Sequence, residues 1–413
     1  MSAGTFGGSV SGATGSLIKS SAGVLTLTGA NTYGAGTTLA AGTLLVGDDA
    51  ALGAGTLTLD AGEFASIGSV ARSFANDLAL GGSVVLGDTT NDGALSFGGA
   101  VSLGGAMRTI STVADVTFAG IVSGTNGGLT KDGAGALTLS AANTFTGGFT
   151  LNTGTVFAGT NTSFGTGTVT LNAGVISAVG SSARTFANAV VLGGDLTFGA
   201  TGNLGDLTFG ALSVGSSART LTTVADTAFT GAFSGSGDLT KDGAGTLTLS
   251  GASTFSGGTT VTGGTLAVTD NAALGTGAVT INGGTVNLTT TTVTNSVTLV
   301  NGSLLGGTVD IATALNAQAG TISSVLSGVG SLSKTTDGAL SLQGNNTYQG
   351  GTTIAGGTVT LGSATALGSG LTTLTGGTLD LNGQTFGTTI AVNGGTLTGG
   401  TLAVTQLASL QAG

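Results

Sequence analysis

Residues 239–268 read LTKDGAGTLTLSGASTFSGGTTVTGGTLAV, and this stretch decides the fold. Apolar residues alternate with threonine in TLTLS, TTVTG and TLAVT, and alternation of period two is typical of a strand with one buried face. Gly-Gly pairs separate the stretches, because glycine permits the corners that join short strands. Strands this short cannot bury a core alone, so the stretch predicts coils of chain that stack on one another.

The same pattern occurs four times, with a lysine at the fifth position and an aromatic residue fourteen positions after it. The four copies span residues 15–46, 127–158, 237–268 and 330–361. Their lysine and aromatic residues are Lys19 and Tyr33, Lys131 and Phe145, Lys241 and Phe255, and Lys334 and Tyr348. Self-similarity of this kind is the signature of a repeat architecture. We interpret the lysine as the mark of a corner and the aromatic residue as a packed corner residue rather than a platform for carbohydrate.

Within the third copy, short and long steps between strands add up to a unit of about 18–20 residues, the scale of one solenoid coil. We therefore predict an all-β fold, a single-stranded right-handed parallel β-helix (β-solenoid) of about 21 coils with about 19–20 residues each. Residues 1–413 are predicted to form one continuous β-solenoid. Its repeat modules are placed at 15–68, 127–180, 237–290 and 330–383, with spacer coils between them.

Composition limits the possible functions. The 413 residues include 82 glycines, no proline, cysteine, histidine or tryptophan, and only 6% charged residues. Without histidine or cysteine there is no Ser-His-Asp triad, thiol nucleophile or histidine-containing zinc site. The net charge of −10 disfavours nucleic-acid binding, which needs basic residues to neutralise phosphates. Polar residues interrupt every apolar run long before the roughly 18 residues of a membrane helix, so we expect no membrane insertion.

Acidic residues offer few candidates for chemistry. The nearest approach to a catalytic pair is Asp48-Asp49, in a turn that favours solvation, so we predict no enzyme, no catalytic residue and no cofactor-binding residue. The loop GDTTNDG places Asp88, Asn91 and Asp92 in one glycine-bounded segment. Because calcium takes oxygen ligands, these three residues are a candidate calcium site, with an exposed turn as the competing interpretation. No other metal site is predicted.

Basic residues occur in one repeated motif and in two possible ion pairs. The motif KDGAG at 131–135 and 241–245 has its lysine before the glycines, whereas a phosphate-binding P-loop has it after them, so we interpret KDGAG as a turn. Arg108 and Asp115 are seven residues apart and could pair across a corner, as could Arg219 and Asp226. An exposed pair of this kind would contribute about 0–1 kcal/mol.

The module resembles a known repeat. Its Leu-x-Lys, glycine turn, Leu-Thr-Leu, Asn/Ser-Thr-aromatic, Gly-Gly-Thr-Thr and Gly-Gly-Thr-Leu elements are similar to the autotransporter-associated β-strand repeat, found in passenger regions of large bacterial surface proteins. The spacers match only each other. The resemblance implies a β-helical, extracellular and mainly structural segment at the bacterial cell surface.

The two ends predict assembly. The tail at 395–413 aligns with 302–320, and the head at 5–19 resembles the continuation at 321–334. Neither end shows a polar cap, and an uncapped coil is an open sheet edge that can pair with another chain. Our main prediction is therefore a structural component of an extracellular or cell-surface fibre or stalk, with the chain itself as head-to-tail partner. The alternative is a slice of an adhesin passenger that binds a surface glycan or protein on host or neighbouring cells. A polysaccharide-active enzyme and an ice-binding protein are less favoured.

Overall fold

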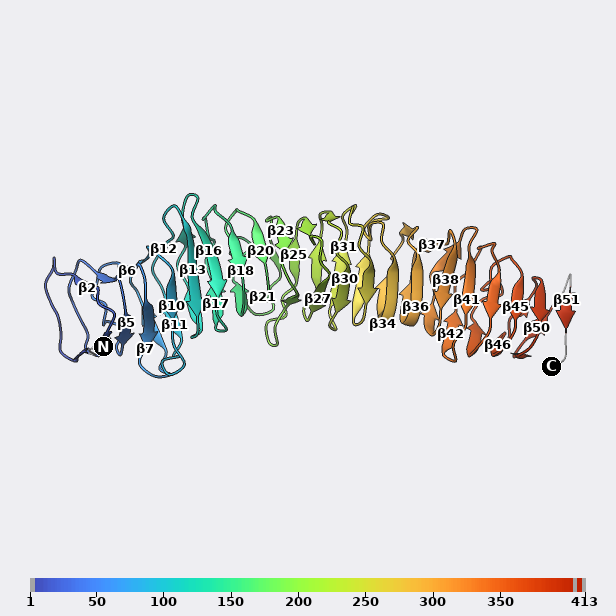
Figure 1. The fold of residues 1–413 in the computed structure, drawn as a ribbon, viewed down its shortest axis with the longest axis horizontal. Coiled ribbons are helices and arrows are strands. Elements are labelled where there is room, and N and C mark those ends of the chain that lie inside the picture. Colours follow the sequence, from blue (N-terminus) through green and yellow to red (C-terminus); the bar gives the residue numbers. More distant parts are fainter. Residues whose placement is uncertain (1–3, 404–406, 411–413) are drawn as a thin grey trace. The chain divides into compact units, whose positions relative to one another are not determined.

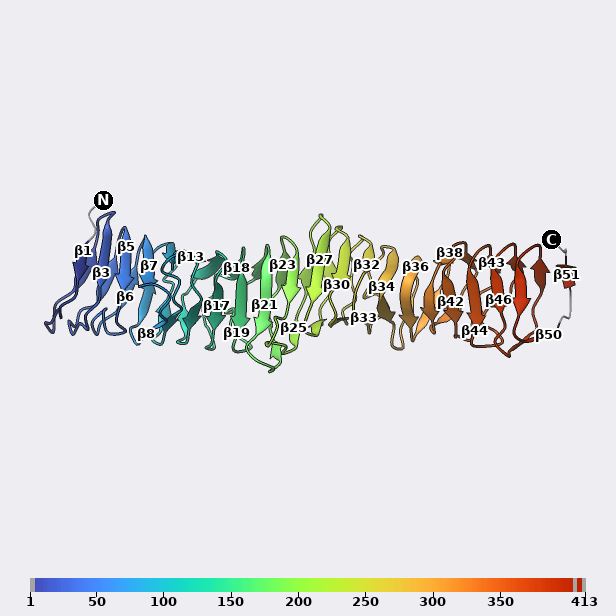
Figure 2. The ribbon, with the colours of Figure 1, turned by 90° about the horizontal axis from the view of Figure 1, so that it is seen from below.

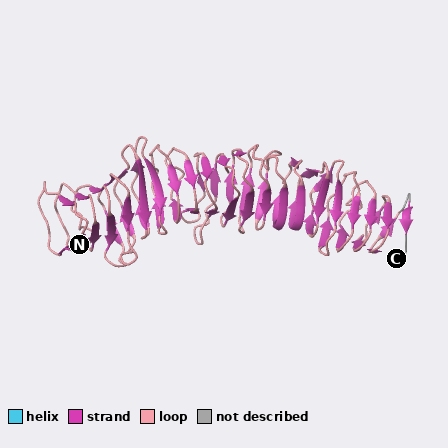
Figure 3. Ribbon diagram, in the orientation of Figure 1, coloured by secondary structure: helices cyan, strands magenta, loops and turns pink. Residues whose placement is uncertain are grey.

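A computed structural model describes residues 4–403 and 407–410 of the chain. Every regular element in these residues is a β-strand, and no helix occurs among them, so none is present there to cross a membrane (Figure 3). The chain divides into two compact units, unit 1 at Met1–Gly210 and unit 2 at Ala211–Gly413. We describe each unit by itself.

Unit 1 consists of three parallel ladders, in which each strand pairs with strands from the coils before and after it. In the first ladder, β13, β16 and β18 lie side by side (Figure 1), as do β1, β3, β5 and β7 (Figure 2). The first ladder contains β1 (Gly4–Phe6), β3 (Val24–Leu27), β5 (Thr43–Val46), β7 (Glu63–Ser66), β10 (Val84–Leu86), β13 (Met107–Thr112), β16 (Gly128–Asp132), β18 (Phe149–Leu151), β20 (Val169–Leu171) and β23 (Val190–Leu192). The second contains β2 (Leu17–Lys19), β4 (Thr37–Leu39), β6 (Leu57–Leu59), β9 (Leu78–Leu80), β12 (Val101–Ser102) and β15 (Val122–Ser123). The third contains β8 (Arg72–Phe74), β11 (Leu95–Phe97), β14 (Val116–Phe118), β17 (Ala136–Leu139), β19 (Thr155–Ala158), β21 (Gly174–Ala178) and β24 (Leu196–Phe198), and beside it β22 (Arg184–Thr185) pairs with β25 (Leu207–Phe209).

Unit 2 repeats this arrangement. Its first ladder contains β27 (Arg219–Thr223), β30 (Leu239–Asp242), β32 (Thr259–Val261), β34 (Val279–Asn287), β36 (Val297–Leu305), β38 (Ala314–Ala317), β41 (Ser331–Lys334), β43 (Thr352–Ile354), β45 (Thr372–Leu374), β48 (Ile390–Val392) and β51 (Leu407–Leu410). The second contains β28 (Thr227–Phe229), β31 (Thr246–Leu249), β33 (Thr265–Val268), the later halves of β34 and β36, β39 (Gly320–Ile322), β42 (Ala339–Leu342), β44 (Thr358–Leu361), β46 (Thr378–Asp380) and β49 (Thr396–Thr398). Shorter ladders pair β26 (Leu212–Ser213) with β29 (Phe233–Ser234), β35 (Thr292–Val293) with β37 (Thr308–Asp310) and β40 (Val325–Ser327), and β47 (Thr385–Phe386) with β50 (Thr401–Leu402).

These ladders confirm the predicted all-β parallel solenoid, with about 20 turns in total. The right-handed sense, the module bounds and a single continuous solenoid over residues 1–413 stay predictions. The tail at 395–413 falls partly outside the described residues, so its structure is not compared with that of 302–320.

Coil length separates the modules from the spacers. Lys131 pairs with Leu151 on the next coil, and Leu151 pairs with Leu171 on the coil after that. The two steps along the sequence are equal in length and match the scale of about 20 residues expected for one solenoid coil. The same two equal steps occur at Lys19, Leu39 and Leu59, at Lys241, Val261 and Ile281, and at Lys334, Ile354 and Leu374. Spacer coils depart from this length, since the step from Leu78 to Val101 in unit 1 is longer and that from Ile281 to Leu299 in unit 2 is shorter. The predicted length therefore describes the modules, and the spacers are longer or shorter.

The core of each unit is a set of stacked apolar side chains, because residues in register on successive coils repeat the same inward positions. From the last strand of the first module through the first spacer of unit 1, these are phenylalanines. Phe64, Phe74 and Phe97 lie with ring centroids 5.4–5.9 Å apart, and Phe118 follows Phe97 at 5.9 Å. Such ring pairs add about 0.5–1.5 kcal/mol each beyond the area they bury.

A module coil carries strands on only two of its three faces. In module 2, β16 and β17 form two faces, and residues 140–148 cross the third without a strand. The irregular segment contains the Asn-Thr-aromatic motif. Side chains must therefore satisfy some of the buried polar groups that a ladder would satisfy elsewhere.

Candidate functional site: the buried corner of the repeat

The lysine of each module points into the solenoid. Lys131 is a rung of an aliphatic column between Ile110 and Leu151, and none of its surface is exposed. Its Nζ donates hydrogen bonds to the carbonyl oxygens of Asp132 (2.9 Å), Gly133 (2.6 Å) and Thr153 (3.2 Å). The first two carbonyls belong to its own corner and the third to the corner of the next coil. The ammonium group therefore joins two successive coils.

Polar groups around Lys131 extend this link to a third coil. Thr112, on the preceding coil, donates from Oγ1 to the Gly135 carbonyl at 2.7 Å. Asp132 accepts at Oδ1 from the Gly133 amide and from the Thr153 hydroxyl, both at 2.8 Å. These bonds lower the pKa of Asp132. The Lys-Asp-Gly sequence thus forms a corner whose polar atoms are satisfied by three coils.

The other modules repeat this arrangement. Lys241 is fully buried and donates to the carbonyls of Asp242 (2.9 Å), Gly243 (2.9 Å) and Gly263 (3.0 Å). Lys19 donates to the Ser21 carbonyl and to that of Ala41 (3.0 Å), and Lys334 donates to the Thr336 carbonyl and to that of Gly356 (3.2 Å). Every lysine of the chain therefore contacts its own corner and the next one.

Burial dominates the electrostatics of these lysines. It lowers the pKa of Lys131 to about 8, against the raising effect of the charges of Asp132 and Asp115. It lowers the pKa of Lys241 to about 8 in the same way, against Asp242 and Asp226. Both amines are mostly protonated at pH 7, and an ammonium has three donors for its three carbonyl acceptors.

An asparagine bridges the strandless face. Asn143 accepts from the Val122 amide at 2.8 Å and donates from Nδ2 to the Ser163 carbonyl at 2.7 Å, so its amide joins the coils before and after it. Asn31 and Asn346 make the equivalent pair of bonds. Module 3 has Ser253 here, which accepts from the Phe233 amide at 3.0 Å and donates within its own coil to Gly251. The Asn/Ser-Thr-aromatic motif is visible in the sequence, but its bridging role was not predicted.

The aromatic residue follows the asparagine by two positions and is buried in all four modules, which confirms the prediction of packed corner residues. Tyr348 hydrogen bonds through its hydroxyl to Thr352 Oγ1 at 2.5 Å, and Thr352 donates to the Leu367 carbonyl at 3.2 Å. Tyr33 and Thr37 make the same contact. Module 3 has phenylalanine in place of tyrosine, and Thr259 Oγ1 beside it is buried without a hydrogen-bond partner.

The candidate calcium residues lie in one loop but bond to the protein itself. Asp88 accepts at Oδ1 from the amides of Thr90 (2.6 Å) and Asn91 (2.8 Å), and at Oδ2 from the Asn91 side chain (2.8 Å). Asn91 Oδ1 accepts from the Gly68 amide, and Asp92 Oδ1 accepts from the Ser69 hydroxyl. These bonds hold the loop as a turn against its neighbour. Within residues 4–403 no three His, Cys, Asp or Glu side chains group to hold a metal ion, and calcium binding itself stays a prediction.

One carboxyl group beside this loop has an unusual titration. Burial first, then a hydrogen bond and the charge of Asp88, raise the pKa of Glu63 to about 7. For Asp88 burial acts in the raising direction, but hydrogen bonds from Asn91 and Thr90 outweigh it and hold its pKa well below the usual range. Glu63 therefore takes up a proton near neutral pH, whereas Asp88 remains ionised.

The predicted arginine–aspartate pairs are wrong. Within the described residues, Asp115 instead accepts from the Ala136 amide (2.8 Å), and Arg108 donates to the Leu103 carbonyl (3.0 Å). Asp226 likewise accepts from the Thr246 amide rather than from arginine. The reason is that Arg108 is the second residue of β13, which runs to Thr112 about 13 Å further along, so the extended strand separates the two groups.

The acidic turn at Asp48 and Asp49 contributes structure. Asp48 accepts from the Ala50 amide at 2.8 Å. Asp49 lies 3.7 Å from Arg72 and accepts from the Ser73 amide at 3.3 Å. Both carboxylates hold the turn and the coil that follows it, as the solvated-turn interpretation expects.

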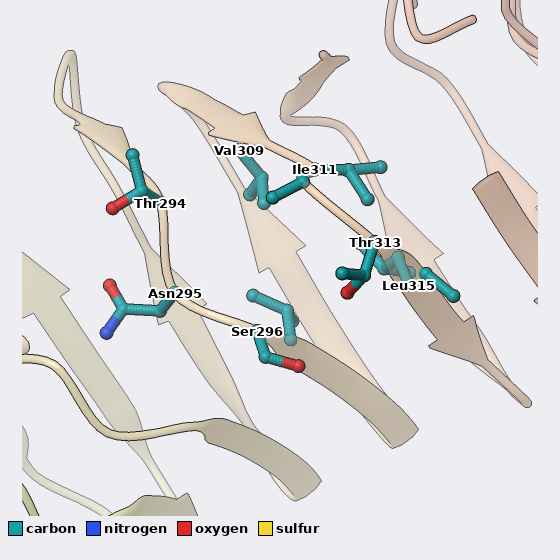
Figure 4. Close-up of a pocket in the computed structure, with 10 residues that line it drawn as sticks. Thr294, Asn295, Ser296, Val309, Ile311, Thr313 and Leu315 are labelled. Atoms are coloured by element: carbon teal, nitrogen blue, oxygen red, sulfur yellow. The ribbon is translucent and has the colours of Figure 1, made fainter. Parts of the chain in front are cut away.

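The cavity of unit 2 offers little room for a small ligand. Figure 4 shows a cavity of about 90 Å³ in unit 2, with Thr294, Asn295 and Ser296 on one coil facing Val309 and Ile311 on the next. Ligand pockets usually measure about 300–1,000 Å³, so this cavity is too small.

A larger hollow of about 460 Å³ in unit 1 lies beside Asn76, whose side chain donates to the carbonyls of Gly53 and Gly55. A hollow of about 130 Å³ recurs at Asn188, which makes the matching bonds to Gly165 and Gly167. The recurrence indicates that these hollows arise from the repeat, where a spacer coil follows the last module turn.

Ladders of short parallel strands around these repeated polar corners define a β-solenoid repeat protein. More particularly, the chain contains four copies of the passenger-associated-transport-repeat, matched at residues 17–46, 129–156, 239–268 and 332–361. The matches confirm the resemblance drawn from the sequence.

A curated relative is the "Adhesin BmaC autotransporter" of Brucella suis biovar 1 (strain 1330). This chain is 34% identical to it over 242 residues, which cover 56% of the chain and 6% of the relative. The chain therefore spans a small part of that protein's length. No solved structure matches the chain.

Proposed function

We propose that this chain is a structural, non-enzymatic segment of an autotransporter-type adhesin passenger exposed at the bacterial cell surface. The proposal is supported by the four repeat copies and by the similarity to an autotransporter adhesin. The alternative weighed from the sequence is thus better supported than the fibre subunit. The observation that carries the proposal is the inward direction of the modules' lysines, asparagines and aromatic residues, since each serves contacts between coils.

The outward surface is uncharged along much of one ladder in unit 2. Thr240, Thr260, Thr280 and Thr298 lie in register on successive coils of the first ladder, facing away from the core. Hydroxyl groups both donate and accept hydrogen bonds, which suits a polar partner rather than an apolar one. The partner we propose is a glycan or a protein on the surface of a host or neighbouring cell.

Adhesion measured with the whole chain tests this proposal. Residues 1–413 displayed on a non-adherent bacterium should raise attachment to cultured cells or to neighbouring bacteria, and soluble chain should compete. Treatment of the target surface with periodate removes glycan partners, whereas treatment with protease removes protein partners. Attachment that stays at the background level, although display of the chain has been verified, would contradict the adhesive role and support a purely structural one.

The head-to-tail polymer predicted from the sequence ends is a separate proposal, and the structure of a single chain does not test it. Light scattering at high concentration, with electron micrographs of the same sample, would distinguish the two. Fibres would support polymerisation, and a monomer at all concentrations would contradict it.

A further inference from the structure

In unit 1, buried polar side chains gather in and around the modules. Module 2 contains four, which are Lys131, Asn143, Ser163 and Ser177. Within residues 77–111, all of them described, no polar or charged side chain is buried. Asn76 and Thr112, at the two limits of this stretch, contact the modules on either side rather than the coils between them.

Separating two coils has different consequences in these two regions. In module 2 it removes the bond from Lys131 to the Thr153 carbonyl and that from Asn143 to the Ser163 carbonyl. Each break exchanges a hydrogen bond inside the protein for one to water, and the bond of the charged ammonium contributes more to stability than a neutral bond does. In residues 77–105 separation breaks backbone bonds, which the modules also have, together with side-chain bonds that are exposed or only part-buried, such as those of Asp77 and Asn91, and it exposes apolar side chains.

Register is also fixed more tightly in the modules. The two steps in the lysine column of module 2 are equal, as they are in the other three modules. The spacer coils of unit 1 are longer and unequal, since the step from Leu78 to Val101 exceeds that from Leu59 to Leu80. A polar network satisfied in one register disfavours every other register, whereas stacked apolar side chains discriminate less.

We propose that unit 1 is built to open at the coils of residues 77–105, while module 2 stays closed as a clamped block. The lysine and asparagine of the module act as the clamps, and the spacer is the yielding segment. The proposal concerns unit 1 alone, since the nine-residue strands β34 and β36 pair along most of their length in the corresponding part of unit 2. It goes beyond adhesion and holds whether or not the chain binds a cell.

Hydrogen exchange followed by mass spectrometry on the full chain tests this order of opening. Under native conditions, peptides covering β9 to β12 should exchange at least tenfold faster than those covering β16 to β20. Equal rates, or slower exchange in the spacer, would overturn the proposal.

A matched pair of variants isolates the clamp. Lys131→Met keeps the length of the side chain and removes the ammonium, so exchange in β16 and β18 should accelerate at least tenfold while β9 to β12 are unchanged. Leu151→Met is the control, because it places methionine one coil further along the same column without loss of a polar contact. Equal acceleration by both variants would show that packing, rather than the clamp, sets the order. Asn143→Ser, which copies the residue of module 3, gives a milder form of the same test if Lys131→Met does not fold.

Discussion

Modules and spacers both stack coil upon coil, but different side chains make the contacts between their coils. A module keeps a constant coil length and places lysine, asparagine and an aromatic residue inside, each bonded or packed against the next coil. The first spacer of unit 1 varies its coil length and stacks phenylalanines. The difference shows that a chain with few charged residues can use its lysines inside the fold, where they hydrogen bond successive coils to one another, since all four lysines are buried.

The largest expected effect comes from removal of a lysine clamp. Lys241→Met removes the ammonium donor from three part-buried carbonyls, so we expect a loss of unfolding free energy on the order of 3 kcal/mol, at about 1–3 kcal/mol for each group left unsatisfied. Urea unfolding followed by circular dichroism measures the loss. Leu299→Met in a spacer coil of the same ladder is the control, with an expected cost below about 1.5 kcal/mol. Similar losses of unfolding free energy in both variants would contradict the distinction between module and spacer coils.

The bridging asparagine should matter less. Asn143→Ser shortens the side chain to that of module 3 and removes the bond to the Ser163 carbonyl, for an expected loss of about 1–3 kcal/mol. The reverse change, Ser253→Asn, should restore a bond to the following coil and raise stability in unit 2. Urea midpoints of both variants check the prediction, and a shift of both in the same direction would contradict it.

A smaller gain is expected at the aromatic position of module 3. Phe255→Tyr supplies a hydroxyl where Tyr33 and Tyr348 have one and gives Thr259 Oγ1 the partner that it lacks. We expect a gain of about 1 kcal/mol, the usual net value of a hydrogen bond. In Phe255→Tyr combined with Thr259→Val the gain should vanish, and persistence of the gain would assign it to another cause.

Stability should also depend on pH. Lys131 and Lys241 have pKa values of about 8 in the folded chain and about 10.4 when unfolded. Between these values the unfolded chain binds more protons, so stability should rise as the pH increases from 8 to about 10. Burial raises the pKa of Tyr33 and Tyr348, which acts in the opposite sense above about pH 10. Urea midpoints should therefore peak near pH 10, and the Lys131→Met, Lys241→Met double variant should lose the rise between pH 8 and 10.

Much of the fold follows from the alternation of apolar and polar residues and from the positions of the glycine pairs. Alternation predicted the strands, glycine pairs predicted the corners, and the spacing of Lys131 and Lys241 from their aromatic residues predicted equivalent places in successive modules. The inward direction of the lysines did not follow, because lysine is almost never fully buried unless paired and its partners here are backbone carbonyls. No sequence pattern marks such acceptors.

Contacts between coils were harder to predict. Arg108 and Asp115 are close in sequence, but an extended strand separates them. Asn143 binds residues about 20 positions away on both sides, and this partner set becomes visible only once the register of the coils is known. Spacer coil lengths escaped prediction for the same reason, since their strands repeat without a fixed marker residue.

Side-chain NMR of the lysines tests the central claim most directly, because the chain has only four of them and selective ¹⁵N-lysine labelling gives four signals. The account predicts slowly exchanging ammonium signals for Lys131 and Lys241 at pH 7, each titrating near pH 8. Signals that exchange rapidly with water and titrate near the ordinary value of about 10.4 would place these lysines on the surface and contradict the account.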